Sequence, residues 1–167
     1  MAFSGAHKRQ ADFSHDQRGA RRAVSLAYFD TSVLVKNYIQ ETGSARVREL
    51  LETYEFVSSA MAAIELHSAV RRRHRQGELS RQNYASILSR VKQDRSFWQL
   101  VEPVSPVLTK AEELVVAYNV RTLDAVHLAS AIVIQDSIGA PFPFIAADER
   151  QLTAARQFNL ETIAVTR

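Results

Sequence analysis

Residues 24–38 read VSLAYFDTSVLVKNY, and this stretch decides the fold. Its first six residues are mostly apolar, which predicts a strand that is buried on both faces. Asp30, Thr31 and Ser32 follow directly and commonly cap a helix, and the next apolar run has helical spacing. A strand, a polar turn and a helix form the first half of a βαβ unit, and ligands bind at the carboxyl ends of such strands. Asp30 therefore lies where a site is expected, although helix capping alone also explains it.

The length and composition narrow the class of protein. A chain of 167 residues predicts one domain with a sizeable core. The sequence has no Cys, which excludes disulfides, zinc–thiolate sites and thiol catalysis. No apolar run approaches the roughly 18 residues that span a bilayer, and the N-terminus has no apolar signal core. We therefore expect a soluble, cytoplasmic protein that does not bind membranes.

The net charge is concentrated in the first residues of the chain. Residues 1–23 carry five Lys and Arg against two Asp, so they account for the whole net charge of +3. This polar segment predicts a flexible basic extension ahead of a folded domain at residues 24–167. The extension either contacts RNA through its arginines or is an artefact of the start site. The neutral remainder must bind any nucleic acid through local patches.

Beyond the opening stretch, helical and extended patterns alternate. Strands are predicted at residues 55–59, 98–104, 142–147 and 162–165, and helices from residue 44, at 60–76, 80–95, 107–118, 123–138 and 148–158. This order predicts an α/β fold, a doubly wound parallel sheet of four or five strands with helices on both faces. The helices at 60–76 and 80–95 are expected to form an αα-hairpin.

Three further acids occupy settings that resemble that of Asp30. Glu65 lies on a small, apolar helix face with no basic residue within its turn, so it is either a helix-edge residue or neutralised by something else. Asp124 falls in the first turn of a helix if Thr122 is the N-cap. Asp148 follows the strand at 142–147, and Gln151 stands at the capping-box spacing from it. Each acid alone therefore has a plain structural explanation.

Taken together, the four acids predict a metal site. The order of the elements brings them to one edge of the sheet, where carboxylates raise one another's pKa unless a divalent cation holds them. Oxygen ligands without Cys or a dedicated His pair favour Mg²⁺ or Mn²⁺ over Zn²⁺. Such sites are commonly used for phosphodiester hydrolysis.

The motifs around these acids resemble those of a known family. The segments YFDTSVL at 28–34, IE at 64–65, LDAVHLA at 123–129 and FIAAD at 144–148 are similar to the PIN domain, the nuclease fold of VapC-type toxins. The similarity covers about residues 24–167. It implies that the catalytic acidic cluster is Asp30, Glu65, Asp124 and Asp148. It also implies that Asp30 and Asp124 are the direct metal ligands and that Ser32 supports the site.

The resemblance also implies a function and partners. A VapC-like protein is expected to be an Mg²⁺- or Mn²⁺-dependent endoribonuclease that forms a homodimer and is silenced by a small cognate antitoxin. One position departs from the family pattern, because Ala146 stands where a Thr or Ser often precedes the last acid. This departure keeps an alternative open, a catalytically decayed PIN-like module that binds RNA or a protein without cleaving RNA.

Two other features of the sequence are an arginine run and a histidine on an apolar helix. The run Arg71, Arg72 and Arg73 ends the Glu65 helix, and it is either a solvated terminus favoured by the helix dipole or a set of phosphate contacts. Arg72 is two turns beyond Glu65 on the same face, so it could face RNA bound at the acids. His127 lies between apolar residues and is expected to be a packed histidine rather than a base.

Overall fold

The computed structural model describes residues 25–118 and 120–165. The strands are Ser25–Phe29 (β1), Tyr54–Ser59 (β2), Gln99–Val101 (β3), Phe144–Ala146 (β4) and Thr162–Ala164 (β5). The helices are Thr31–Tyr38 (α1), Ser44–Thr53 (α2), Ala62–Arg75 (α3), Arg81–Asp94 (α4), Ser105–Tyr118 (α5), Thr122–Ile138 (α6) and Glu149–Gln157 (α7), with a short 3₁₀ helix at Arg95–Phe97 (η1). The predicted elements therefore exist, with ends that differ by at most three residues.

The strands form one five-stranded sheet in the order β3-β2-β1-β4-β5, and every neighbouring pair is parallel. β1 is central, with Tyr28 opposite Val57 of β2 on one side and opposite Phe144 of β4 on the other. The strand order reverses at β1, and its carboxyl end is therefore the topological switch point. The α/β fold predicted from the sequence is confirmed, and Asp30 follows the last residue of β1 at this point.

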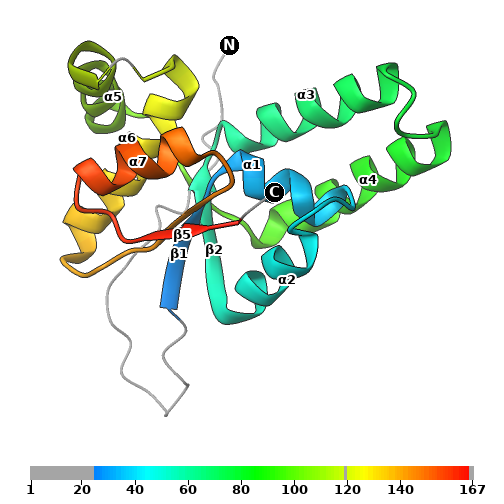
Figure 1. Ribbon diagram of the computed structural model, residues 1–167, viewed down its shortest axis with the longest axis horizontal. Coiled ribbons are helices and arrows are strands. Elements are labelled where there is room, and N and C mark those ends of the chain that lie inside the picture. The colour runs from blue at the N-terminus through cyan, green and yellow to red at the C-terminus, as the bar shows by residue number, and fades with distance from the viewer. Residues whose placement is uncertain (1–24, 119, 166–167) are drawn as a thin grey trace, which may run out of the picture.

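Helices cover both faces of the sheet (Figure 1). Tyr28 of β1 belongs to the core that α5, α6 and α7 close on one face, whereas its neighbours Ala27 and Phe29 pack with α1 and α2 on the other. This alternation follows from the two-residue period of a strand. β1 is apolar toward both faces because both are covered.

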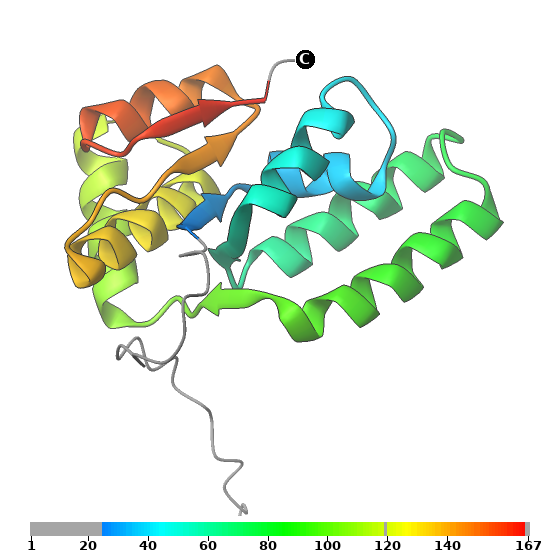
Figure 2. The ribbon, with the colours of Figure 1, turned by 90° about the horizontal axis from the view of Figure 1, so that it is seen from below.

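The αα-hairpin predicted at residues 60–96 is confirmed as α3 and α4, which project from the body of the domain (Figure 2). Its apolar side chains, among them Leu66, Val70 and Val91, pack against α1 in a separate core. Ser80 caps α4 by accepting a hydrogen bond from the Asn83 amide. The hairpin thus fixes the position of Glu65 on α3 relative to α1 and Asp30.

Two local predictions were wrong in detail. α6 begins at Thr122 itself and its N-cap is Arg121, so Thr122 is not the N-cap, although Asp124 does lie in the first turn as expected. Asp148 does cap α7, but Gln151 bonds to Asp124 and does not complete a capping box. Within the described part of the chain no helix is long and apolar enough to cross a membrane. The extension predicted at residues 1–23 lies outside the described residues.

Candidate active site at the carboxyl edge of the sheet

Asp30 is held at the end of β1 by backbone and side-chain contacts. Its amide donates to the carbonyl of Ile145 in β4 at 2.9 Å, and its Oδ2 accepts from the Ser32 amide at 2.8 Å. The residue is buried, although its carboxylate lies at the first turn of α1. Asp30 therefore does cap α1, and one carboxylate oxygen remains outside that capping bond.

Ser32 joins the two strand ends that carry Asp30 and Asp148. Its hydroxyl accepts a hydrogen bond from the Ala147 amide at 3.1 Å. Ala147 follows β4 directly, so this bond ties α1 to the end of the neighbouring strand. The position agrees with a supporting role, which the resemblance assigned to this side chain.

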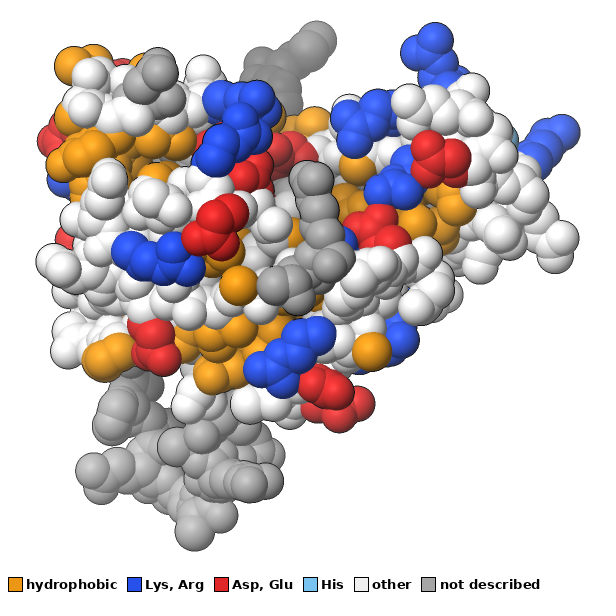
Figure 3. Space-filling view, in the orientation of Figure 1, with side chains coloured by type: hydrophobic (Ala, Val, Ile, Leu, Met, Phe, Trp, Pro, Cys, Tyr) orange, Lys and Arg blue, Asp and Glu red, His pale blue; other side chains and the backbone are white. Residues whose placement is uncertain are grey.

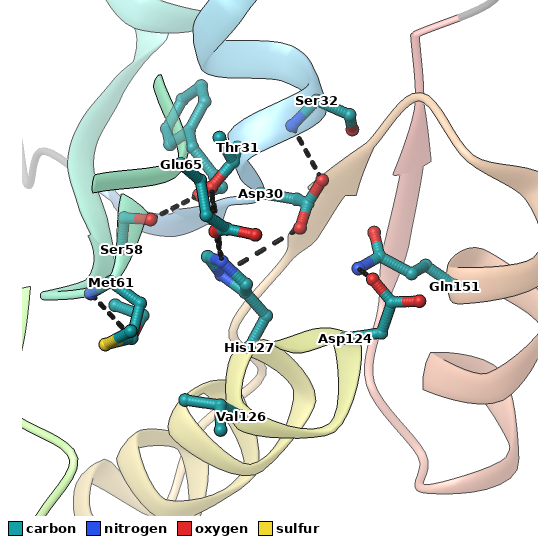
Figure 4. Close-up of polar contacts among 12 residues, drawn as sticks. Asp30, Thr31, Ser32, Ser58, Met61, Glu65, Asp124, Val126, His127 and Gln151 are labelled. Atoms are coloured by element: carbon teal, nitrogen blue, oxygen red, sulfur yellow. Dashed lines mark hydrogen bonds and ion pairs between the residues drawn. The ribbon is translucent and has the colours of Figure 1, made fainter. Parts of the chain in front are cut away.

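Glu65 reaches the same edge from α3, and its partners come from other elements. Its Oε2 accepts from the Thr31 hydroxyl at 2.7 Å and lies 2.6 Å from Nε2 of His127. Figure 4 shows the carboxylates of Glu65 and Asp30 both facing the His127 ring, with Asp124 and Gln151 farther along the edge. The neutralising partner that the local sequence lacks is therefore a histidine 62 residues away.

His127 is packed, as predicted, and it is also the link between Glu65 and the core. Its ring is 1% exposed, and Nδ1 lies 2.9 Å from the hydroxyl of Tyr28, which is fully buried. A carboxylate only accepts, so Nε2 must carry the proton, and in the neutral ring Nδ1 accepts from Tyr28. The four side chains Tyr28, His127, Glu65 and Thr31 form one hydrogen-bonded chain.

The charges of Glu65 and His127 in this set of hydrogen-bonded side chains compensate one another. Burial alone would lower the pKa of His127, but the hydrogen bond to Glu65 and the charges of Asp30 and Asp124 outweigh burial and raise it. Burial would likewise raise the pKa of Glu65, but the bonds from His127 and Thr31 lower it. Glu65 therefore stays ionised at neutral pH beside a histidine that favours the charged form.

Asp124 is in a different electrostatic situation. Burial and then the charges of Asp30 and Asp148 raise its pKa, against the weaker opposite effects of Arg121 and a hydrogen bond. That bond comes from Nε2 of Gln151 to Oδ1 of Asp124 at 2.9 Å. Asp124 therefore lies in the negative field of Asp30 and Asp148, which Arg121 offsets only in part.

Asp148 has a cationic partner at the surface. Its carboxylate caps α7 by accepting from the Arg150 amide, and it also pairs with the Arg150 guanidinium at 2.9 Å. These hydrogen bonds lower the pKa of Asp148. Asp148 is thus more exposed and better neutralised than Asp124.

Among the described residues, no group of three His, Asp or Glu side chains stands close enough together to hold a metal ion. Each of the predicted acids instead has its own protein partner. The donor chemistry still fits a divalent cation. The edge offers carboxylate oxygens, and a positive ion offsets the charges of Asp30 and Asp148, which add to burial in raising the pKa of Asp124. The predicted cluster therefore shares one edge and one field without forming a closed ligand set.

The predicted arginines separate into different settings. Arg73 pairs with Glu41 at 2.6 Å and with Glu78 at 3.0 Å. Arg71 lies over the ring of Tyr84, and Arg72 is exposed and lines a cleft of about 500 Å³ whose wall also includes Ser32 and Asp148. Of the three arginines, Arg72 alone lines the same cleft as Asp148 without an ion pair to another described residue.

Comparison with known families and proteins agrees with this fold. The family model described as "PIN domain" matches residues 27–157. Ribonuclease VapC45 and Ribonuclease VapC49, from the CDC 1551 / Oshkosh and ATCC 25618 / H37Rv strains of Mycobacterium tuberculosis, are each 33% identical over 134 residues. The matched region covers 77% of this chain and 88% of each relative.

Two solved structures share the architecture at lower sequence identity. The crystal structure of FitAcB from Neisseria gonorrhoeae has a TM-score of 0.61 at 16% identity and covers 83% of this chain and 96% of its own. A toxin–antitoxin complex from Klebsiella pneumoniae has a TM-score of 0.56 at 16% identity, covering 75% of this chain and 89% of its own. At such identities these neighbours support the fold alone.

Proposed function

This chain belongs to the PIN domain family, and on that basis we propose that it is a divalent-metal-dependent endoribonuclease, the toxin of a toxin–antitoxin pair. The observation that carries the proposal is the ionised Glu65 carboxylate, held beside Asp30 at the switch point by Thr31 and His127. The relatives named ribonucleases support RNA as the substrate class.

Asp30 and Asp124 would hold the cation, Mg²⁺ or Mn²⁺, which supplies charge stabilisation for a bound phosphate. Glu65 orients the attacking water through the oxygen that Thr31 and His127 leave unbonded. The water attacks phosphorus in line and loses one proton to solvent, the P–O3′ bond breaks, and the 3′ oxygen leaves and takes up a proton from solvent. The product carries a 5′ phosphate. Asp148 completes the negative edge from the start of α7.

Arg72 is the arginine that we assign to RNA. Its exposure and its place in the cleft beside Ser32 and Asp148 let it meet a phosphate next to the one being cleaved. Figure 3 shows Lys and Arg side chains gathered over the part of the molecule where α3 lies. Arg71 can contribute at longer range. Arg73 is engaged by Glu41 and Glu78, so we assign it to holding α3 against the loop before α2.

The partners follow from family membership. We propose a small cognate antitoxin and a second copy of this chain, in line with the toxin–antitoxin complex among its structural neighbours. Both are testable by co-expression and by measuring the mass of the purified protein in solution. Location in the cytoplasm belongs to the same proposal.

A second candidate function rests on the last acid. Ala146 lacks a hydroxyl beside the strand end, and Asp148 is already neutralised by Arg150. These features favour a decayed module that binds RNA or a protein without cleavage. RNA cleavage that requires both a divalent cation and Asp30 would favour the nuclease over the decayed module.

The deciding experiment maps cleavage sites on RNA with Mn²⁺, with chelator, and with the variant Asp30→Asn. We expect cleavage only by the wild type with metal, and a loss of at least about 100-fold in Asp30→Asn, because a bound metal ion contributes several kcal/mol of charge stabilisation to the transition state. The matched control is Asp136→Asn, an exposed acid on α6 outside the site. Cleavage by Asp30→Asn within a few-fold of wild type would refute the nuclease proposal.

The assignment of Arg72 has its own test in a matched pair of neighbours. In chelator, Arg72→Gln should flatten the salt dependence of binding to single-stranded oligouridine by roughly 0.7 in log–log slope for one lost phosphate contact. Arg73→Gln should change that slope less but lower the melting temperature, because Glu41 and Glu78 lose their partner. Equal slopes for wild type and Arg72→Gln would indicate that Arg72 lies at a solvated helix end and does not contact phosphate.

A further inference from the structure

Gln151 presents a buried oxygen without a partner at the acidic edge. The side chain lies in the first turn of α7 and is 4% exposed. Its Nε2 donates to Asp124, which fixes which end of the amide is the oxygen. Oε1 is buried and has no hydrogen-bond partner among the described residues. Buried polar atoms rarely stay unsatisfied, because leaving one without a partner costs free energy.

The direction of this oxygen limits what can satisfy it. Figure 4 shows the Gln151 oxygen turned away from Asp124, toward the side on which Asp30 lies. An amide oxygen only accepts, so its partner must be a proton donor or a cation. The surrounding field comes from Asp30, Asp124 and Asp148, and it favours a positive partner.

We propose that Oε1 of Gln151 is an oxygen ligand of the divalent cation, alongside Asp30 and Asp124. Mg²⁺ and Mn²⁺ accept mixed sets of carboxylate, amide and water oxygens. The inference rests on the proposed metal-dependent function. It adds a neutral ligand from α7 to a site whose other protein ligands come from the end of β1 and from α6. The same side chain also orients Asp124 through its amide nitrogen.

The chain offers a matched control for this side chain. Gln135 of α6 also has a buried Oε1 without a partner among the described residues, but its amide nitrogen faces the carbonyl of Asn159. That contact joins α6 to the residues after α7, and Gln135 is 11 positions beyond Asp124 along the helix. Replacing Gln135 therefore tests what loss of a buried amide does without touching the acids.

The experiment measures Mn²⁺ affinity directly, by electron paramagnetic resonance of free Mn²⁺ and by the rise in melting temperature with added Mn²⁺. Gln151→Leu should weaken Mn²⁺ binding by about 10- to 100-fold, the range seen when a supporting metal-site group is removed. Gln135→Leu should bind Mn²⁺ like the wild type. Both variants are expected to fold, and circular dichroism checks this.

Gln151→Glu separates the oxygen from the amide nitrogen. Glu keeps an oxygen at this place but cannot donate to Asp124 when ionised, and it adds a negative charge. If the oxygen is a ligand, Gln151→Glu melts lower than the wild type in chelator yet binds Mn²⁺ at least as tightly as the wild type. If Gln151 acts only by orienting Asp124, Gln151→Glu binds Mn²⁺ as poorly as Gln151→Leu, and the proposal is wrong.

Two further outcomes keep this inference apart from the nuclease proposal. Mn²⁺ affinity of Gln151→Leu within about threefold of wild type, less than the range for a supporting group, overturns the ligand role even if RNA is cleaved. If the wild type cleaves no RNA, loss of Mn²⁺ affinity in Gln151→Leu together with retained Mn²⁺ affinity in Gln151→Glu still supports the ligand role, while the proposed nuclease function fails.

Discussion

Glu65 and Asp124 lie on two sides of the same edge, and their charges are balanced in opposite ways. On the Glu65 side, defined by Tyr28, Thr31, Glu65 and His127, buried hydrogen bonds lower the pKa of Glu65 and raise that of His127. On the Asp124 side, defined by Asp124, Asp148 and Gln151, burial and neighbouring acids raise the pKa of Asp124, and a buried amide oxygen lacks a partner among the described residues. The Glu65 carboxylate is neutralised by a histidine within the protein, whereas the Asp124 carboxylate is bonded, in the part of the chain that the structure describes, only by the neutral amide of Gln151.

This difference indicates that the two sides of the edge have separate roles. A compensated group keeps its geometry without a ligand, which suits a residue that must orient a water molecule. An uncompensated group gains most when a cation binds. The same contrast predicts which substitutions destabilise the fold and which stabilise it.

The largest effect is expected for Glu65→Gln. It removes the charge that His127 and Thr31 hold, so RNA cleavage should fall by at least about 100-fold. Loss of a charge-assisted hydrogen bond should also lower the free energy of unfolding by roughly 1.5–3 kcal/mol. Cleavage assays and urea denaturation measure the two effects. Unchanged stability would mean that the Glu65 side is not held by this bond.

His127→Gln should produce a smaller loss whose size depends on pH. The folded-state pKa of His127 is raised above its ordinary 6.5, so its stabilisation is fully present below that value and is lost as the pH rises through the folded pKa. Glu65, whose pKa is lowered from 4.5, contributes above that value and loses its contribution as the pH falls through the folded pKa. The free energy of unfolding of the wild type should therefore exceed that of His127→Gln most between pH 4.5 and pH 6.5. Denaturation at several pH values measures the difference, and a constant difference would contradict the charged pair.

Tyr28→Phe should cost about 1 kcal/mol, the typical contribution of one hydrogen bond. The ring keeps its stacking on Phe144, so only the contact with Nδ1 of His127 is lost. Thermal denaturation measures the change. A matched control is Tyr38→Phe, which removes the hydroxyl bond to Asp94 far from the acids. Only Tyr28→Phe should also lower the cleavage rate.

The smallest effect, and the one of opposite sign, is expected for Asp124→Asn. Since burial and the charges of Asp30 and Asp148 raise the pKa of Asp124, removing its charge should raise the melting temperature in chelator at neutral pH. Added Mn²⁺ should reduce or reverse this difference in melting temperature, because Mn²⁺ binding stabilises the native wild type more than the variant. Arg150→Gln, which alters only an exposed pair, should leave the melting temperature nearly unchanged. If Asp124→Asn is less stable in chelator and metal shifts both proteins equally, Asp124 is a structural residue.

Local pattern was enough to predict the fold and the positions of the acids along it. The run at 24–38 places Asp30 after a buried strand, and turn and helix signals place Glu65 on α3 and Asp148 at the start of α7. These features depend on neighbours within a few residues, where the periods of strands and helices apply. The alternation of elements then determines a parallel sheet with one switch point.

Only the tertiary structure decided which side chains meet at that edge. Gln151 joins Asp124 across 27 residues, His127 joins Glu65 across 62 and Tyr28 across 99, and no local period encodes such separations. The same holds for Arg72 and Arg73, which are adjacent in sequence but differ because one of them meets Glu41 across 32 residues. The physical reason is that side-chain pairing depends on how helices pack over the sheet, which sums contacts along the whole chain.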